Sequence, residues 1–427
     1  MALNKDIVIT AYGVISPIGV TSEEYWNSML QQQSGVRLST KLGLEGTARW
    51  LCSEVPEYEP KKYVRSRRAT KKSFKVMSDD ILLGYAAACQ ACNKVDVLPG
   101  SDSIDPERLG VLFGADLIGL QISEMLSSIA KSAEKGVMRH ESFGEHAMGD
   151  ITPLWMLKYL PNMPACHIGI GHDARGPNNS LTLEGVSSLA ALSEACRTIE
   201  RGQADIMIAG GTSCRINPFT WSRSGSYHLS SRKDDPAAAM RPFDSDRDGT
   251  VLGEGAAAFI LETREHAEAR GVKPIAQILG FGHRFHWHDQ KVAPSENAIR
   301  GSIEAALQDA DVAASDIDHV NADGLSDPLF DASEAKAIRA ALGDVPVTAP
   351  KSYFGNLSAA AGAVEMIASL KAFEHGIVPT TLNYETPDPE CPVNVVQGEP
   401  LAKEQSIAML MSQCRTGRAA SMVIAKA

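Results

Sequence analysis

The first half of the chain alternates between short apolar runs and longer runs in which apolar residues recur every three or four positions. The first pattern is typical of buried strands and the second of amphipathic helices. Residues 6–15, DIVITAYGVI, therefore predict a strand, and 21–33, TSEEYWNSMLQQQ, predict a helix that Thr21 caps. The same patterns predict helices over 77–95 and 188–203 and strands over 109–116 and 204–213.

The second half repeats this alternation. Strands interleaved with helices are typical of an α/β fold with layered, largely parallel sheets. A chain of 427 residues is too long for one simple core, so we expect two similar halves, 1–250 and 251–427. They should share a core, because no change in composition marks a flexible linker. In the second half we predict strands over 256–262, 276–282, 317–324 and 421–427, and helices over 296–310, 331–342 and 359–376.

Composition and charge narrow the class of protein. A formal net charge of −11 argues against a general nucleic-acid-binding protein. Residues 1–20 lack the basic start and long apolar block of a signal peptide, and no apolar run is long enough to predict a membrane span. With eight cysteines and no secretory signal, we expect a cytoplasmic protein with reduced thiols.

One stretch departs from this acidic balance. Residues 61–75, KKYVRSRRATKKSFK, carry eight basic residues and no acidic one. The stretch is either a solvated helix face or a docking surface for a small acidic partner, because a basic cluster on an acidic protein creates a directed local field. The docking hypothesis rests on Lys62, Arg65, Arg67, Arg68, Lys71 and Lys72.

Two other groups of residues bear on metal binding. Cys89 and Cys92 form a CxxC motif, but the motif lies in an Ala-rich helical run and lacks a second pair of ligands, so we interpret both thiols as packing residues. His283, His286 and His288 follow a predicted strand, which alone is weak evidence for a metal site. We therefore expect no metal and no organic cofactor.

A loop at 176–188, GPNNSLTLEGVSS, leads into the next predicted helix. Such a loop often presents a nucleophile, because the helix dipole stabilises negative charge at the helix N-terminus. Here the chain carries Glu184 and Gly185, and neither is a thiol or a hydroxyl. Ser187 and Ser188 lie further along the helix, where their side chains turn away from position 185, so we interpret them as packing residues.

The most distinctive long segment is RPFDSDRDGTVLGEGAAAFILE, residues 241–262. It closely resembles the segment that links the two halves of β-ketoacyl-acyl carrier protein synthases, in the thiolase-like superfamily. The resemblance extends over almost the whole chain and includes residues 7–19, the region 110–185, 204–213 and KSYFGNLSAAAGAVE at 351–365.

This resemblance implies a five-layered αβαβα sandwich of two pseudo-duplicated halves and a dimer. It also implies an acyl carrier protein as partner and a role in fatty-acid-like or polyketide-like biosynthesis. In related ketosynthases the region that corresponds to 61–75 contributes to contact with the acidic carrier protein, which favours the docking hypothesis.

Matched position by position, the resemblance implies that the reactive side chains of a condensing enzyme are replaced. The family's catalytic cysteine falls on Gly185, and its two histidines fall on Asp323 in NADGL and on Asn356 in KSYFGN. The late glycine-rich turn is matched by QCRTG, 413–417, with Arg415 at the position of a gating phenylalanine. Lys351, Glu334 and Glu365 stand where the family has a lysine and structural acids.

These replacements are not chemical substitutes. Gly185 has no side chain to carry an acyl group, and an ionised Asp323 accepts hydrogen bonds but cannot donate one to an enolate oxygen. We therefore expect no decarboxylative condensation. The Glu184-Gly185 pair resembles the pattern of chain-length factors, sister chains that commonly carry Gln at the cysteine position with Glu before it.

Three hypotheses follow. The first, which we favour, is a non-condensing, chain-length-factor-like subunit that pairs with an active ketosynthase. The second is an enzyme that hydrolyses or transfers acyl thioesters by altered chemistry, through Glu184, Asp323, Lys351 and Asn356. The third is a homodimeric module that binds acyl groups or a carrier protein. The sequence leaves open whether the chain pairs with itself or with a ketosynthase.

Cys414 lies in the late turn and is a further candidate nucleophile. We interpret it as a packing residue, because a lone cysteine is usually buried and inert.

Overall fold

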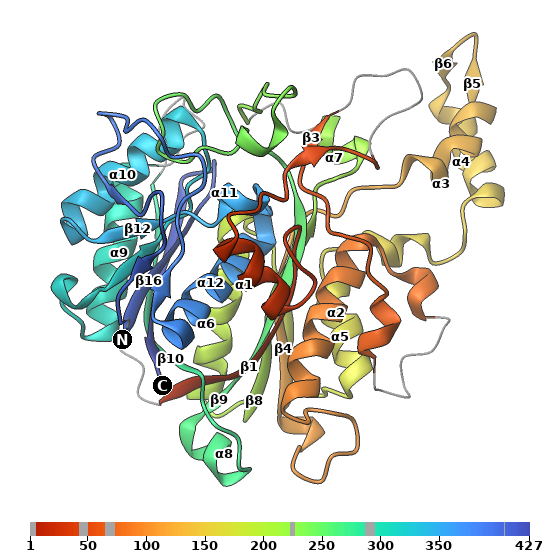
Figure 1. The fold of residues 1–427 in the computed structure, drawn as a ribbon. Coiled ribbons are helices and arrows are strands. Elements are labelled where there is room, and N and C mark those ends of the chain that lie inside the picture. Colours follow the sequence, from red (N-terminus) through yellow and green to blue (C-terminus); the bar gives the residue numbers. More distant parts are fainter. Residues whose placement is uncertain (1–5, 42–49, 65–72, 223–226, 287–294, 405) are drawn as a thin grey trace.

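The computed structural model describes residues 6–41, 50–64, 73–222, 227–286, 295–404 and 406–427. Its central feature is an 11-stranded sheet that runs through the molecule (Figure 1). Across this sheet the strands follow the order β14-β12-β11-β16-β17-β10-β1-β9-β8-β4-β7.

Ten of these strands form two sets with the same topology. In both sets the order across the sheet is third, second, fourth, fifth and first strand of the set. In both, the second strand pairs in parallel with the third and fourth, and the fifth pairs antiparallel with the fourth and first. The first set is β1 (Ile7–Ile15), β4 (Leu109–Ala115), β7 (Asn178–Leu181), β8 (Ile206–Cys214) and β9 (Glu254–Thr263). The second is β10 (Ala276–Phe285), β11 (His319–Asn321), β12 (Pro346–Thr348), β16 (Ile407–Gln413) and β17 (Arg418–Lys426), and β14 (Asn394–Val395) extends its edge.

The repeated topology confirms the predicted α/β fold of two similar halves. The expectation of largely parallel sheets was wrong, because five of the ten pairings among the described strands of this sheet are antiparallel. The two halves join where β1 and β10 pair antiparallel, with Ile7 opposite Ile278. However, β9 pairs with β1 and β8, so it completes the first set although the sequence-based division at residue 250 placed it in the second half. The changeover between the strand sets therefore lies between Thr263 and Ala276. An apolar run predicts a strand but not its sheet, because hydrogen-bonding partners decide that.

Helices cover both outer faces of the folded sheet and fill the space between its halves (Figure 1). On the first half, α2 (Asp79–Lys94) contacts β1, β8 and β9, and α5 (Met163–His172) packs on α2 and β4. On the second half, α9 (Glu296–Ala310) contacts β10 and β17, and α10 (Pro328–Leu342) packs on α9. The helices α6 (Ser187–Glu200) and α12 (Ala361–His375) contact strands of both halves and form the middle layer. This arrangement confirms the five-layered αβαβα sandwich.

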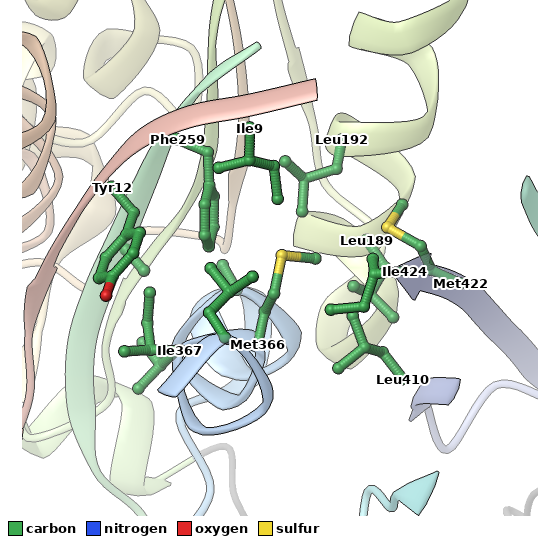
Figure 2. Close-up of a cluster of buried hydrophobic side chains, with 14 of the residues drawn as sticks. Ile9, Tyr12, Leu189, Leu192, Phe259, Met366, Ile367, Leu410, Met422 and Ile424 are labelled. Carbon is green, nitrogen blue, oxygen red and sulfur yellow. The ribbon is translucent and has the colours of Figure 1, made fainter. Parts of the chain in front are cut away.

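The core is centred on α12. Figure 2 shows Met366 and Ile367 of this helix packed among Ile9 of β1, Phe259 of β9 and Leu410 of β16, and each of these side chains is at most 2% exposed. All residues from 361 to 373 are buried, as expected for a helix enclosed on all sides. Each such large apolar side chain stabilises the fold by about 1.5–3 kcal/mol.

Shorter elements complete the described part of the chain. Thr21 accepts a hydrogen bond from the backbone N–H of Glu24 and so caps the first helix, as predicted. No helix among the described residues has the length and apolar character needed to cross a bilayer. The shorter elements are α1 (Ser22–Leu30), β2 (Arg37–Leu38), β3 (Leu51–Cys52), α3 (Ile122–Lys131), β5 (Ala133–Glu134), β6 (Val137–Met138), α4 (His140–Asp150), α7 (Pro218–Ser222), α8 (Arg264–Ala269), α11 (Lys351–Phe354), β13 (Ile377–Val378) and β15 (Leu401–Ala402).

One region, which we call the arm, comprises residues 117–160 and contains α3, β5, β6 and α4. It projects away from the body of the molecule (Figure 1). The sequence analysis did not predict these elements. The arm carries large apolar side chains that are 44–88% exposed, namely Leu117, Ile122, Leu126, Val137, Met148, Leu154 and Met156.

Candidate functional site

The loop between β7 and α6 brings residues 184–186 to the N-terminus of a middle-layer helix. Glu184 adopts a left-handed backbone conformation, with φ of 54°, which is uncommon for a residue other than glycine. Ser187 holds this turn, because its hydroxyl donates to the Glu184 carbonyl at 2.7 Å and accepts from the Leu183 N–H at 2.8 Å. The loop is therefore a tight turn whose backbone is held by the Ser187 hydroxyl.

Gly185 faces the backbone of the β16–β17 turn. A Cβ atom at this position would lie 2.3 Å from the carbonyl oxygen of Gln413, far inside van der Waals contact. The neighbouring atom belongs to the backbone of a strand, so it cannot rotate away as a side chain would. In this conformation, position 185 accommodates glycine alone.

Below Gly185 lies a buried ion cluster. The Lys351 ammonium, at the start of α11, donates to Asp323 Oδ1 at 2.8 Å and to Glu365 Oε1 at 2.5 Å. Lys351 and Glu365 are each 1% exposed, and Asp323 is 2% exposed. Asp323 follows β11 and Glu365 lies on α12, so the cluster ties three elements together.

Glu334 of α10 supports the same loop from behind. Its carboxylate accepts hydrogen bonds from the backbone N–H groups of Asp323, at 2.7 Å, and Gly324, at 2.9 Å. The Gln413 side chain donates to it at 3.2 Å. Glu334 therefore fixes the Asp323 loop relative to the β16–β17 turn.

Asn356 lies beside the same site. Its side-chain Oδ1 accepts a hydrogen bond from the backbone N–H of Ser358 at 2.9 Å, and its backbone N–H donates to the Val251 carbonyl at 2.7 Å. Together with Gly185, Asp323 and Lys351 it lines a cavity of ≈ 10 Å³. That volume is about the room that one water molecule needs.

On the outer side, Glu184 and Arg415 form an ion pair, with Arg415 Nε 2.8 Å from Glu184 Oε1. The Arg415 guanidinium also lies 5.2 Å from the centre of the Tyr227 ring, in a cation–π contact. Burial is the main reason why the pKa of Tyr227 is raised to about 12, so this phenol stays neutral at physiological pH.

Charge is unbalanced in the ion cluster, where Lys351 supplies one positive charge for the carboxylates of Asp323, Glu334 and Glu365. Burial raises the pKa of Glu365 to about 8; Lys351 opposes this shift and Asp323 adds to it. Burial likewise raises the pKa of Glu334 well above its usual range, with Asp323 as the next cause. Burial alone would lower the pKa of Lys351, but Asp323 and Glu365 raise it above its ordinary value. Lys351 is therefore a charged ammonium, and at least one of the acids holds a proton near neutral pH.

The structure thus brings most of the predicted site residues together. Gly185, Asp323, Lys351, Asn356 and Arg415 line one cavity. Glu334 and Glu365 lie directly behind it through hydrogen bonds, and Glu184 pairs with Arg415 at its rim. Sequence reasoning missed the contributions of Gln413 and Tyr227. Gln413 begins the QCRTG match, whereas no motif marks Tyr227.

Other residues from the sequence analysis have structural partners. Ser188 Oγ accepts from the Ala363 N–H at 3.1 Å, and the Cys414 thiol lies 3.0 Å from the Thr416 hydroxyl. Cys89 and Cys92 are buried in α2, as expected for packing residues. His283 lies 3.0 Å from the Ser193 hydroxyl, while His288 lies outside the described residues. Among the described residues, no group of His, Cys, Asp and Glu side chains is arranged to hold a metal ion.

The basic stretch is described only in part. Lys62 is 74% exposed and lies 3.6 Å from Glu59. The remaining members of the docking hypothesis, Arg65, Arg67, Arg68, Lys71 and Lys72, lie outside the described residues.

The raised pKa of Glu365 predicts a pH-dependent contribution to stability. In the folded protein this carboxyl group keeps its proton up to a pH of about 8, whereas the unfolded chain releases it near 4.5. Stability therefore falls as pH rises through this window. We expect the difference in unfolding free energy between the unmodified protein and Glu365→Gln to fall with pH, by up to about 1.4 kcal/mol per pH unit. Chemical denaturation at several pH values from about 5 to 8 measures this difference.

The matched control is Glu374→Gln, on the same helix but with its side chain 54% exposed. This variant removes a carboxyl group that is open to solvent, so comparison of the two variants isolates the effect of burial. A pH-independent difference for Glu365→Gln would contradict the assignment of a proton to the cluster.

Comparison with known proteins places this geometry in a family. The sequence profile of the β-ketoacyl synthase N-terminal domain matches residues 4–267, and that of the C-terminal domain matches residues 275–385. The chain is 31% identical over 411 residues to 3-oxoacyl-[acyl-carrier-protein] synthase 2 of Synechocystis sp., covering 95% of this chain and 94% of that protein. It is 32% identical over 400 residues to the protein of that name from Vibrio cholerae, covering 92% of each.

Solved structures agree. The chain is similar to the ishigamide ketosynthase/chain length factor, with a TM-score of 0.84, 26% identity and 99% of each chain covered. It is also similar to a β-ketoacyl synthase from Burkholderia phymatum STM815, with a TM-score of 0.86, 26% identity, and coverage of 99% of this chain and 100% of that one. A third similar structure is AntDE:AntF, a type II polyketide synthase acyl-carrier protein in complex with its ketosynthase (TM-score 0.83, 26% identity, 99% of each chain). The chain therefore belongs to the β-ketoacyl synthase family, with the thiolase-like fold and a ketosynthase-like place in fatty-acid or polyketide biosynthesis.

Proposed function

We propose that this protein is a non-condensing member of the family that pairs with an active β-ketoacyl-acyl carrier protein synthase, as a chain-length factor does. The observation that carries the proposal is at position 185, where the family resemblance places the nucleophile. Gly185 has no side chain, and the Gln413 carbonyl oxygen occupies the space that one would need.

The other site residues support the same conclusion. Asp323 and Asn356, at the positions matched to the family's histidines, already take part in local hydrogen bonds. Asp323 accepts from Lys351, and a carboxylate would repel the enolate that condensation forms, by roughly 1–4 kcal/mol at about 4 Å. The cavity of ≈ 10 Å³ leaves no room for a thioester.

Altered thioester chemistry has less support. It requires a nucleophile or a free base, but Lys351 is a charged ammonium that donates to the carboxyl groups of Asp323 and Glu365. The Glu184 carboxylate is held by Arg415. We therefore favour the role of a partner subunit over hydrolysis or acyl transfer.

The exposed apolar residues of the arm support a protein partner. Large exposed apolar patches usually mark interaction sites. In addition, β7 is an edge strand of the sheet, hydrogen-bonded to β4 alone among the described strands. An open strand edge readily pairs with another chain. The similarity to a ketosynthase/chain length factor favours a related ketosynthase as the partner, and the similarity to AntDE:AntF favours an acyl carrier protein as a further one.

Co-expression tests the partner. We expect this chain to co-purify as a heterodimer with a ketosynthase that carries an intact Cys-His-His set and is encoded beside it. Replacing Leu126 and Met148 of the arm by Asp should weaken that complex, because it introduces charge into an apolar contact. The matched control is the same change at Leu329, which is 54% exposed but lies on α10, away from the arm. A stable homodimer that binds no such ketosynthase would refute the proposal.

A cysteine placed at position 185 tests whether this position can carry an acyl group. We expect Gly185→Cys to lower the free energy of unfolding by about 1–3 kcal/mol, because the new Cβ atom displaces the Gln413 backbone. Mass spectrometry after incubation with acyl carrier substrate should find no acyl group at this position in the unmodified protein or in this variant. The control thiol, Ala190→Cys on α6, the helix that follows this turn, should change stability less, because Ala190 lines an open groove. An acyl group at position 185 in either protein would contradict the proposal.

Charge reversal tests the docking hypothesis. We expect Arg67, Arg68 and Lys72 changed together to Glu to weaken carrier-protein binding about tenfold or more, and we expect binding to fall as salt concentration rises. Titration by fluorescence anisotropy measures both effects. Reversal of three exposed cations of the second half should leave binding unchanged; these are Lys273, Arg300 and Lys336. Equal affinities for the two triple variants would exclude the stretch as the docking surface.

A further inference from the structure

An exposed lysine outside the candidate site, Lys94, ends the helix α2. Its ammonium lies over the ring of Tyr12 on β1, 4.7 Å from the ring centre. It also donates to the Ser22 hydroxyl of α1 at 3.5 Å, which is long for a hydrogen bond. A cation–π contact at an exposed position stabilises the cation only weakly. The Lys94 amine is therefore packed against protein on one side and open to solvent on the other.

The carboxylates near Lys94 are held by other groups. Glu23 accepts from the Ser22 hydroxyl at 2.9 Å and lies 4.0 Å from the Lys371 ammonium. Glu374 pairs with Lys371 at 2.8 Å. Lys94 itself forms no ion pair within the described part of the chain. The cluster thus places a second cation near Lys94 and leaves the ammonium of Lys94 without a carboxylate partner.

Tyr12 does not replace the missing carboxylate. It is 6% exposed, and burial is the first reason why the pKa of its hydroxyl is raised, with Glu374 as the next cause. The phenol is therefore neutral near physiological pH and supplies no negative charge to the Lys94 ammonium.

These surroundings favour the neutral amine. Removal of the ammonium from water lowers the pKa of Lys94 and is the largest cause of the shift. The charge of Lys371 lowers it further, whereas Glu23 and Glu374 oppose the shift. Loss of water and a neighbouring cation are the two features that activate lysine nucleophiles in proteins.

A second exposed lysine shows the opposite arrangement. Lys336 of α10 has a side chain that is 42% exposed and donates to Glu390 at 2.6 Å. This hydrogen bond is the first cause that raises the pKa of Lys336. Lys94 and Lys336 are thus two accessible amines of one chain that differ in their electrostatic surroundings.

We propose that Lys94 is a site of spontaneous N-acylation by small acyl thioesters. The neutral amine attacks the carbonyl carbon of the thioester, so that a C–N bond forms and the C–S bond breaks. The thiolate leaves and takes up the proton that the nitrogen loses, which gives an amide and a free thiol. A thiolate is a good leaving group because the pKa of a thiol is only about 8.5. This inference goes beyond the proposed function and does not rest on it.

Acetylation of the full chain with S-acetyl-N-acetylcysteamine, a small free thioester, tests the proposal. Peptide mass spectrometry measures the rate at each lysine, and Lys336 is the internal control. We expect Lys94 to be acetylated at least about threefold faster than Lys336 near neutral pH, because more of it is neutral. The rate at Lys94 should also level off at a lower pH than the rate at Lys336. Equal rates, or a faster reaction at Lys336, would overturn the proposal.

Two variants test the electrostatic cause. Lys371→Gln removes the neighbouring cation, so it should slow acetylation of Lys94 about twofold or more. Glu374→Gln removes an opposing acid and the partner of Lys371, so it should speed acetylation by about the same factor. Structural damage would not change the two rates in opposite directions. The rate at Lys336 should be the same in both variants.

The Glu374 side chain is 54% exposed and that of Lys371 is 7% exposed, so Glu374→Gln is compatible with folding even if Lys371→Gln is not. A rate at Lys94 that stays unchanged in Glu374→Gln would overturn the proposal. None of these measurements involves a ketosynthase or a carrier protein, so failure of this proposal and failure of the proposed function are distinguishable.

Discussion

The site depends on one buried ammonium group. Lys351 is 1% exposed and contacts carboxyl groups from two other elements, Asp323 after β11 and Glu365 on α12. A charge at such depth is tolerated only because it is paired, and removal of one partner of a buried pair typically costs about 3–5 kcal/mol. The pairing of Lys351 with Asp323 and Glu365 therefore fixes the geometry of the loops around Gly185.

That pairing also limits the chemistry of the site. Both carboxyl groups that contact Lys351 accept hydrogen bonds from it, and the Glu334 carboxyl group accepts hydrogen bonds from the backbone N–H groups of the Asp323 loop. The cluster has more acids than cations, and burial raises the pKa values of Glu334 and Glu365, so we infer that the cluster holds a proton near neutral pH. A reaction that builds negative charge beside Asp323 is disfavoured by the same imbalance that stabilises the cluster.

Much of the fold could be predicted from the sequence, because its elements have clear periodicity. The strands β1, β4 and β8 and the helices α6 and α12 lie where the apolar patterns indicate them. The assignment of β9 to the first half could not be predicted, since it depends on pairing with β1 and β8. The helices of the arm were also missed, although the sequence of α3 is strongly amphipathic; that of α4 is only weakly so.

The candidate site could also be predicted only in part. The family resemblance identified Gly185, Asp323, Lys351 and Asn356, which line one cavity. It could not reveal that the Gln413 carbonyl closes position 185, because a backbone atom leaves no mark on the residue type. The role of Tyr227 between Arg215 and Arg415 was equally hidden, because it arises from segments far apart in the chain.

The short turn between β16 and β17 connects two hollows. Its first residue, Gln413, closes the cavity at Gly185, and Arg415, two residues later, lines a neighbouring hollow of ≈ 210 Å³. The turn is held by backbone hydrogen bonds from Cys414 to Arg418 and from Gly417 to Cys414. Its position is set by the antiparallel pairing of β16 with β17, which runs from Ile407–Ala425 to Gln413–Ala419. The β16–β17 hairpin therefore both closes the cavity at Gly185 and lines the neighbouring hollow. The position of this hairpin depends on backbone pairing in the sheet and not on the side chains of the site.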